Sequence, residues 1–270
     1  MPIHPTAIID RSAEIDPSAD IGAYSVVEQN VRVGPRVRLY AHTYVSEGTA
    51  LGADCQVHPF AIVGHPPQDL KFTGEPSFTE VGEGSVLREH VSIHRGTVPG
   101  STTVVGRRCF VMSAGHIGHN CVVGDDVVIA SGAVLGGHAV VGDRAFISGN
   151  AALHQFVRVG ELCMVAGVVA VLQDVPPFMT VGRPPHVTGP NVVGLRRAGL
   201  SNEERQEIRH CHRLLYRSGV PLPKAIAQLG DHIRTDPGRR LLEFLQAPSK
   251  RGLMRARRRS TVPEAGEDVA

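Results

Sequence analysis

Aromatic residues are scarce in this chain of 270 residues. It contains no tryptophan, four tyrosines and eight phenylalanines, although 42% of its residues are hydrophobic. A globular core usually takes much of its buried area from aromatic rings, so an ordinary α/β sandwich or helical bundle becomes less expected. The hydrophobic content and the 20% of charged residues nevertheless predict a folded, soluble protein rather than a disordered one.

Signals for export, membrane insertion and metal binding are also missing. No apolar run approaches the roughly 18 residues that span a bilayer. The first ten residues, MPIHPTAIID, lack a basic segment followed by an apolar one. None of the five cysteines forms a CxxC pair, which disfavours metal and redox roles. We therefore expect a cytoplasmic protein with reduced thiols, no stable membrane insertion, no metal and no cofactor.

Charge is distributed unevenly although the net charge is only +2. Residues 196–259 hold 16 Lys and Arg against 6 Asp and Glu, a net of +10, so the remainder carries −8. A basic C-terminal third suggests an acidic partner or a polyanion, and a solvated helical surface explains it equally well. Nothing in the sequence suggests nucleic acid as the partner.

Branched aliphatic residues recur at every sixth position. From 3 to 171, 26 of 29 such positions are Ile, Val or Leu, and the exceptions are Asp69, Glu75 and Pro99. Gly frequently follows the aliphatic residue, and a small residue commonly stands two places before it. Cysteines also occupy this small position, which predicts that they are buried (Cys55, Cys109, Cys121 and Cys163).

This period fits neither a 3.6-residue helix nor an alternating strand, but it fits a short strand followed by a tight turn. The fold predicted is an all-β left-handed parallel β-helix of hexapeptide repeats, in which residues i and i+18 stack about 4.8 Å apart. We expect the β-helix over residues 1–177, with loop insertions at 65–80 and 95–104. After it come a connecting segment at 178–195, a small α-helical domain at 196–248 and a disordered tail at 249–270. Ser201 and Glu204 form a capping box that predicts a helix start.

The phase of a residue is its position within the 18-residue coil, given by its number modulo 18. Four histidines have nearly the same phase, namely His116, His119, His138 and His154. They should share one edge of the prism, with Gln155 above His119. Imidazole suits proton transfer near neutral pH, so this edge predicts acid–base catalysis. A solvated structural histidine edge and a zinc site like that of γ-type carbonic anhydrases are the alternatives; the closely spaced ligand pair of the latter is missing. His94 and His58 share another phase and are expected to be structural or peripheral.

Several segments together resemble the UDP-N-acetylglucosamine O-acyltransferases, which perform the first step of lipid A biosynthesis. The resemblance runs from about residue 3 to 253 and is carried by the following segments: PQDLKFTGEPS (67–77), VSIHRGT (91–97), HIGHNCVVG (116–124), AVLGGHAVVGD (133–143), ALHQFVRVG (152–160), QDVPP (173–177) and GLRRAGL (194–200). It implies transfer of a 3-hydroxyacyl group from acyl carrier protein to the glucosamine 3-hydroxyl of UDP-N-acetylglucosamine. It also implies a homotrimer with active sites between neighbouring prisms, and the basic segment would then dock the acidic carrier protein.

The resemblance assigns roles to individual residues. It makes His119 the general base and a backbone N–H near Gly137 the donor to the oxyanion. Gly167 matches the position that limits acyl-chain length, where Gly implies a longer chain. The remaining matches are substrate contacts: Asp69, Lys71, His116, His138, His154, Gln155, Asn191, Arg196 and Arg197.

One departure from the family concerns the residue after the general base. The family usually has Asp there, whereas this chain has Asn120, which can orient the imidazole without supplying charge. Other readings stay open: N-acylation of a 3-amino sugar nucleotide, an acetyl-coenzyme A-dependent hexapeptide acetyltransferase, and a β-helix scaffold without enzymatic activity. The last explains the hexads but not the four-histidine edge.

Overall fold

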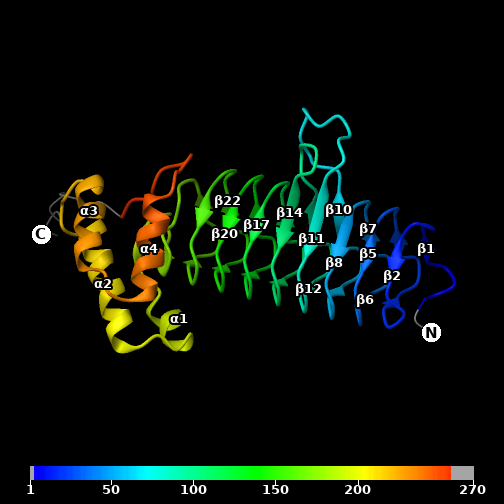
Figure 1. Cartoon of the computed structure of the whole chain (residues 1–270), viewed down its shortest axis with the longest axis horizontal. Helices are drawn as coiled ribbons and strands as arrows, with labels where there is room; N and C mark the ends of the chain where they lie inside the picture. Colours follow the sequence, from blue (N-terminus) through cyan, green and yellow to red (C-terminus); the bar gives the residue numbers. More distant parts are fainter. Residues whose placement is uncertain (1–2, 257–270) are drawn as a thin grey trace, which may run out of the picture.

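Short parallel strands form a long three-sided prism in the computed structural model, which describes residues 3–256 (Figure 1). We call its three sheets face A, face B and face C. Face A comprises β3 (Asp20–Ile21), β6 (Arg38–Leu39), β9 (Gln56–Val57), β12 (Val86–Leu87), β15 (Phe110–Val111), β18 (Val128–Ile129), β21 (Phe146–Ile147), β24 (Met164–Val165), β26 (Met179–Val181) and β27 (Val187–Pro190). Face B comprises β1 (Ile8–Ile9), β4 (Val26–Val27), β7 (Tyr44–Val45), β10 (Ile62–His65), β13 (Ser92–His94), β16 (His116–Ile117), β19 (Val134–Leu135), β22 (Ala152–Leu153) and β25 (Ala170–Val171). Face C comprises β2 (Glu14–Ile15), β5 (Arg32–Val33), β8 (Thr49–Leu51), β11 (Phe78–Val81), β14 (Thr102–Val105), β17 (Val122–Val123), β20 (Val140–Val141) and β23 (Arg158–Val159).

The hexad aliphatic residues form the core of this prism. Ile117 pairs with Leu135 one coil further, and both are fully buried. The preceding residue of each two-residue strand points outward, because successive side chains alternate across a strand. The small corner positions are filled as the sequence predicts, since Cys55, Cys109, Cys121 and Cys163 are all buried. A column of aliphatic side chains this narrow leaves little room for rings, which explains the scarcity of aromatics.

Three edges separate the faces, and each has its own chemistry. We name them after the faces they join: edge BC, edge CA and edge AB. Edge CA carries ion pairs between successive coils, such as Arg107 with Asp125 and Arg108 with Asp126. Edge BC carries both loop insertions, which rise from the top of the prism in Figure 1.

The insertions are shorter than the sequence predicts. Face B extends to His65 before the first loop, and β11 and β14 begin at Phe78 and Thr102, inside the ranges expected to be loops. The reason is that the ends of the two loops pair with each other, with Phe78 opposite Thr102 in a parallel register. The true excursions are therefore residues 66–77 and 95–101.

The connecting segment at 178–195 contains strands and a short helix. β26 joins face A, with Thr180 opposite Met164, and β27 returns antiparallel to it. This coil has sixteen residues instead of eighteen, so it falls outside the hexad frame. Helix α1 (Val192–Arg197) follows directly.

Three longer helices complete the C-terminal part: α2 (Asn202–Tyr216), α3 (Leu222–His232) and α4 (Asp236–Gln246). Ser201 and Glu204 form the capping box that the sequence predicts at the start of α2. The chain then returns to the prism, where Leu253 bridges to Asp174 and Met254 is buried. Residues 249–256 are thus ordered against the prism rather than a disordered tail. The rest of that predicted tail lies outside the described residues.

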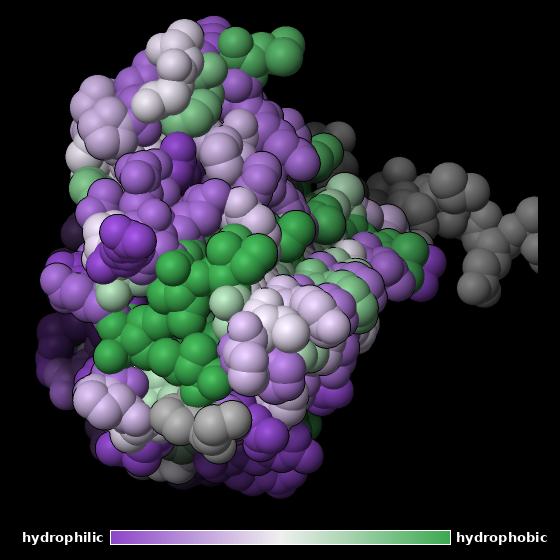
Figure 2. Space-filling view, turned by 90° about the vertical axis from the view of Figure 1, so that its right-hand side faces the viewer, coloured by the Kyte–Doolittle hydropathy of each residue, from purple (hydrophilic) through white to green (hydrophobic). Residues whose placement is uncertain are grey.

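The N-terminal end of the prism is open in the described part of the chain. Ile3, a hexad aliphatic residue, is 43% exposed because no earlier coil covers it, and Ile8 is 67% exposed because it points outward on face B. Apolar side chains gather at this end of the molecule in Figure 2. No helix within residues 3–256 is long and apolar enough to cross a membrane.

Candidate active site

Edge BC brings the histidines together. His119 lies in the turn after β16, and His138 lies in the turn one coil further, with their ring centroids 5.2 Å apart and perpendicular. His138 stacks on Phe156 of the following coil at 4.7 Å. His154 and Gln155 precede Phe156 in the same turn, and Gln155 is exposed. The predicted row of imidazoles along one edge is therefore present.

His119 packs closely against bare backbone. A Cβ atom on Gly137 would lie 2.4 Å from its Nε2 atom and 2.5 Å from its Cε1 atom, so the ring needs glycine there. The Gly137 N–H donates no hydrogen bond to any atom within residues 3–256. On the other side of the ring, Nδ1 lies 3.0 Å from Oδ1 of Asn120. The imidazole is thus held at both edges, beside an unused backbone donor.

The neighbouring imidazoles are neutral at physiological pH. Burial, and then the proximity of His119, lowers the pKa of His116. Burial is also the main cause that lowers the pKa of His138; His119 and Lys250 add to it, whereas Asp69 opposes it. His116 also pairs with Ser92, whose Oγ lies 2.8 Å from Nδ1. His116 and His138 therefore favour the neutral form.

His94 lies beside this row of imidazoles, although its phase along the coil placed it elsewhere. Its ring lies 5.0 Å from that of His116, and it is buried. The phase comparison failed because the second insertion lengthens the coil, so that Ser92 pairs with His116 at a distance of 24 residues rather than 18. Its Nδ1 accepts a hydrogen bond from the Gln68 N–H of the first loop.

Asp69 and Lys71 lie on the first loop above the same edge. The Lys71 N–H donates to Oδ1 of Asp69, so the turn fixes the carboxylate, while the Lys71 side chain is exposed. Asp69 is close enough to His138 to affect its pKa. The loop therefore brings one carboxylate to the row of imidazoles.

Other predicted contacts lie elsewhere in a single chain. Asn191 caps α1 by accepting from the Gly194 N–H and donates to Leu162 O on edge CA, so structural contacts engage both its oxygen and its nitrogen. Arg196 and Arg197 are exposed on α1, near edge CA, and in Figure 1 α1 lies opposite the insertion loops. Gly167 lies on edge AB, across face B from His119. One chain does not bring these four residues to the imidazoles.

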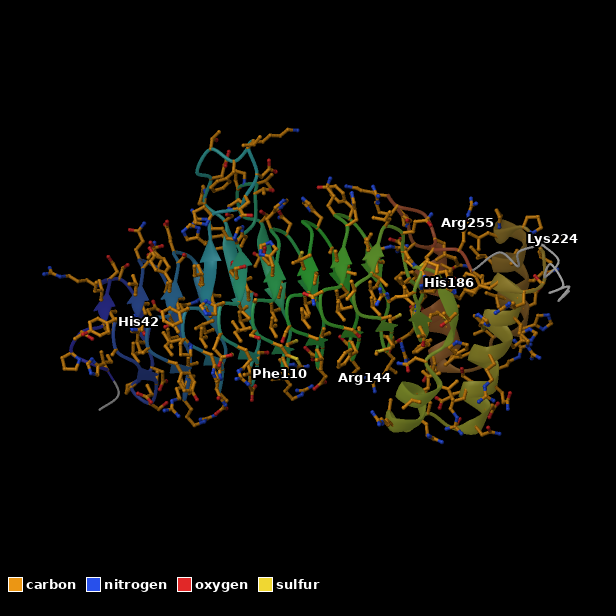
Figure 3. The ribbon with its side chains drawn as sticks, turned by 180° about the vertical axis from the view of Figure 1, so that it is seen from behind. His42, Phe110, Arg144, His186, Lys224 and Arg255 are labelled. Carbon is orange, nitrogen blue, oxygen red and sulfur yellow. The ribbon has the colours of Figure 1, made fainter. Side chains whose placement is uncertain are left out.

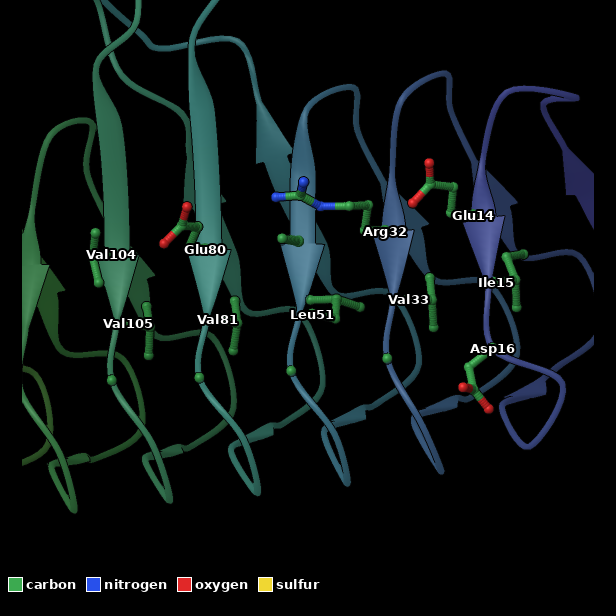
Figure 4. Close-up of a pocket in the computed structure, with 15 residues that line it drawn as sticks. Glu14, Ile15, Asp16, Arg32, Val33, Leu51, Glu80, Val81, Val104 and Val105 are labelled. Atoms are coloured by element: carbon green, nitrogen blue, oxygen red, sulfur yellow. The ribbon is translucent and has the colours of Figure 1, made fainter.

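A shallow trough of about 800 Å³ lies on face C, away from the histidines (Figure 4). Its outward side chains alternate in charge, with Glu14, Arg32 and Glu80. Its lining contains no histidine, serine, threonine or cysteine, so it does not offer the acid–base chemistry expected for this acyl transfer. Within residues 3–256, no group of three His, Cys, Asp or Glu side chains is placed to hold a metal ion.

A prism of hexapeptide coils with imidazoles along one edge defines the class of left-handed β-helix transferases. A family model described as UDP-N-acetylglucosamine O-acyltransferase, domain 2, matches residues 174–254. Two acyl-[acyl-carrier-protein]–UDP-N-acetylglucosamine O-acyltransferases match 94% of this chain. That of Syntrophobacter fumaroxidans is 42% identical over its whole length, and that of a Psychrobacter species is 46% identical over 99% of its length. The chain therefore belongs to the UDP-N-acetylglucosamine O-acyltransferase family.

Solved structures agree with this assignment. LpxA from Acinetobacter baumannii superposes with a TM-score of 0.91 at 36% identity, covering 94% of this chain and all of that one. The UDP-N-acetylglucosamine acyltransferase of Francisella novicida superposes with a TM-score of 0.92 at 30% identity, covering 99% of this chain and all of that one. The predicted left-handed parallel β-helix with a small α-helical C-terminal part is confirmed.

Proposed function

We propose that this chain transfers a 3-hydroxyacyl group from acyl carrier protein to the glucosamine 3-hydroxyl of UDP-N-acetylglucosamine, in lipid A biosynthesis. Relatives named as acyl-carrier-protein-dependent O-acyltransferases of UDP-N-acetylglucosamine match it along nearly their whole length, which supports this proposal. The observation that carries the mechanism is the position of His119, whose Nε2 edge lies against Gly137, beside an unused backbone N–H.

His119 acts as the general base. Its Nε2 takes the proton of the sugar 3-hydroxyl as that oxygen attacks the thioester carbonyl carbon. The carbonyl oxygen becomes an oxyanion and accepts a hydrogen bond from the Gly137 N–H. When the carbon–sulfur bond breaks, the proton on His119 passes to the departing thiolate, which leaves the ester and the free carrier thiol.

The surrounding residues orient the substrate. Asp69 and Lys71 hold the glucosamine from the loop, and His116 and His138 contact the sugar and the phosphate. Their lowered pKa values make these two rings weaker bases than an ordinary imidazole, so they donate hydrogen bonds to the substrate rather than take its proton. His154 and Gln155 contact the substrate further along edge BC.

The acyl chain crosses face B toward Gly167. The outward side chains between edge BC and edge AB at this height are apolar, namely Val134, Ala152 and Ala170. A hydrocarbon chain lying over them removes apolar surface from water. Gly167 adds no side chain at the far edge, which leaves room for a longer chain.

The active enzyme is a homotrimer of parallel prisms. Faces A and B carry apolar outward residues in their C-terminal halves, whereas edge CA carries ion pairs. Packing face B of one chain against face A of the next brings the second chain's edge CA to the first chain's edge BC. Arg196 and Arg197 of the second chain then reach the diphosphate, for which their forked donors are suited.

Acyl carrier protein docks at the C-terminal end. Lys224 and Arg255 lie at this end in Figure 3, and α1 carries two further exposed arginines. An acidic partner is attracted to such a surface, which accelerates association. We infer a cytoplasmic location because the proposed donor, acyl carrier protein, is itself a soluble protein.

One assay tests this function. The purified protein is mixed with UDP-N-acetylglucosamine and 3-hydroxyacyl carrier protein, beside His119→Ala and a control variant, His4→Ala, which alters an exposed histidine of the first coil. We expect product from the wild type and the control, and a loss on the order of 100-fold or more in His119→Ala. Equal product from all three would reject His119 as the base. Running the 3-amino sugar nucleotide in parallel distinguishes O- from N-acylation.

A further inference from the structure

One amide oxygen beside His119 receives three contacts. Oδ1 of Asn120 lies 3.1 Å from the backbone N of Thr97, 2.9 Å from Thr97 Oγ1 and 3.0 Å from Nδ1 of His119. Thr97 belongs to the second loop insertion, residues 95–101, and not to the coil that carries Asn120. A loop residue 23 positions earlier in the chain therefore determines how the side chain beside His119 is oriented.

The chemistry of these groups fixes which way the Asn120 amide points. A backbone N–H can only donate, so the Asn120 atom that faces Thr97 must be the oxygen and not the NH₂ nitrogen. The same oxygen faces Nδ1 of His119 and can only accept from it. Nδ1 therefore carries the hydrogen, and in the neutral ring Nε2 is left with the free electron pair.

We propose that Thr97 is a positioning residue: by fixing the Asn120 amide, it holds His119 in the Nδ1–H tautomer, so that Nε2 is the base. This inference rests on the proposed function, because it explains how the base is prepared for the 3-hydroxyl. Nε2 is also the atom nearest to where a Gly137 Cβ would stand. The base and the unused Gly137 N–H are thus presented on the same side of the ring.

The positioning is achieved without negative charge. The titratable groups around His119 are the imidazoles of His94, His116 and His138, with Lys250 and Asp69 beyond His138. Asn120 is neutral, so no carboxylate touches the ring to stabilise its protonated form. Asn120 therefore orients the imidazole through a neutral hydrogen bond and not through an ion pair.

The loop that supplies Thr97 is itself held in place. Ser101 Oγ donates to Val98 O and accepts from the Val98 N–H, and Ser77 Oγ donates to Gly96 O. These bonds fix the backbone on both sides of Thr97. The position of its N–H is therefore a property of the folded loop and not of a mobile side chain.

The tautomer can be observed directly by ¹⁵N NMR of the histidine rings, with His119 assigned by comparison with His119→Gln. We expect Nδ1 of His119 to be protonated in the wild type and a mixture of tautomers in Asn120→Ala. Asn120 has a φ of 59°, where alanine is strained, so Asn150→Ala, with a φ of 53°, measures that strain alone. A wild type in the Nε2–H form, or an Asn120→Ala variant unchanged from it, overturns the proposal.

Activity provides a second test that does not depend on unfolding. Asn120→Asp keeps a residue that tolerates this φ and places a carboxylate at Nδ1 of His119. Because a carboxylate favours the protonated ring, the pH at which kcat/KM rises should shift to a value about one unit higher. Asn150→Asp should leave that pH unchanged. Thr97→Val keeps the backbone N–H and loses one hydroxyl bond, so we expect a loss of about fivefold in kcat with little change in KM.

The two proposals fail in different ways. If His119→Ala stays active, the proposed base is wrong, although the NMR result still reports which tautomer Asn120 selects. If His119→Ala is inactive while Asn120→Asp leaves the pH profile unmoved, His119 is the base and the positioning role of Asn120 is rejected.

Discussion

A Cβ atom at position 137 would stand 2.4 Å from Nε2 of His119, closer than any real carbon approaches a ring. Position 137 must therefore be glycine because the His119 ring, one coil earlier, occupies the space of a side chain. The backbone conformation of Gly137 itself would accept another residue, because its φ is not positive. The absence of a side chain here leaves space for the ring, and it also leaves the backbone N–H open to a substrate.

Gly137→Ala should consequently inactivate the enzyme while leaving its fold intact. The added methyl group must displace the imidazole, and a shift of about 1 Å in a reacting group can reduce a rate on the order of 100-fold. Gly189→Ala is the matched control, because a Cβ there meets nothing within 4 Å and its φ is not positive. Steady-state kinetics with thermal unfolding would check this, and normal kcat in Gly137→Ala would contradict the geometry.

The fold could be predicted from the sequence further than the site could. From Ile21 onward the hexad aliphatic residues are all buried, and so the frame is visible in the sequence without any knowledge of the contacts. His94 shows where this reasoning stops, because a loop of unknown path changes the register from 18 to 24 residues. The contact between Thr97 and Asn120 depends on the same loop and leaves no periodic signal. The short helix α1 and the pairing of Leu253 with Asp174 were missed for a similar reason: each depends on a tertiary contact.

His94 should make stability depend on pH in the acid range. Burial is the main cause that lowers its pKa to about 4; His116, His65 and His119 add to it. The unfolded chain binds a proton at this side chain below about pH 6.5, whereas the folded chain binds it only near pH 4. The stability that the neutral ring contributes is therefore fully present above pH 6.5 and is lost as the pH falls toward 4.

Urea unfolding of the wild type and of His94→Gln across pH 4–8 would test this. The glutamine can still accept from the Gln68 N–H and does not titrate. We expect the wild type to lose more free energy of unfolding than the variant between pH 6.5 and 4. Parallel curves for the two proteins would show that His94 does not contribute to the acid sensitivity.

Asp174 connects the last regular coil of the prism to the C-terminal segment. Its fully buried carboxylate accepts hydrogen bonds from the backbone N–H and from Nε of Arg158. Its backbone N–H donates to Gly252 O, and its backbone oxygen accepts from the Met254 N–H. Asp174→Ala leaves the Arg158 guanidinium, whose side chain is only 19% exposed, without its partner. We expect a loss of about 3 kcal/mol in the free energy of unfolding.

Removing both charges should cost less than removing one. In the Asp174→Ala, Arg158→Met double variant no unpaired buried charge remains, and the methionine can still pack near Phe244, over which Arg158 lies at 4.3 Å. Chemical unfolding of the two single variants and the double variant gives the coupling energy. Purely additive losses would mean that the pair itself contributes little.

Gly167 provides a test of acyl-chain selection. A Cβ there would lie 3.1 Å from Gly149 O, a contact that a small adjustment relieves, so a side chain can be accommodated. Gly167→Met should then shift preference toward shorter 3-hydroxyacyl chains by filling the far edge of face B. A panel of carrier proteins with different chain lengths measures the preference, with Gly189→Met as the control. An unchanged preference would remove Gly167 from the determinants of chain length.

Face A should be an interface between copies of this chain. Its outward row contains Phe110, Val128, Phe146 and Met164, all only partly buried in one chain. Large apolar side chains of this kind are typical of the centre of an interface. The wild type should therefore have a molar mass of three times the 28.9 kDa of one chain.

Phe146→Asp should dissociate this trimer, because it would bury an unpaired charge between two apolar faces. Val140→Asp is the matched control, since Val140 is an exposed outward valine on face C, on the strand β20 that directly precedes β21 of Phe146. Light scattering with size-exclusion chromatography gives the molar mass of each variant, and circular dichroism shows whether the prism persists. If Phe146→Asp separates the copies, its activity should fall with its assembly, because Arg196 and Arg197 would no longer reach a neighbouring row of imidazoles. A folded, trimeric and active Phe146→Asp variant would place the interface on another face.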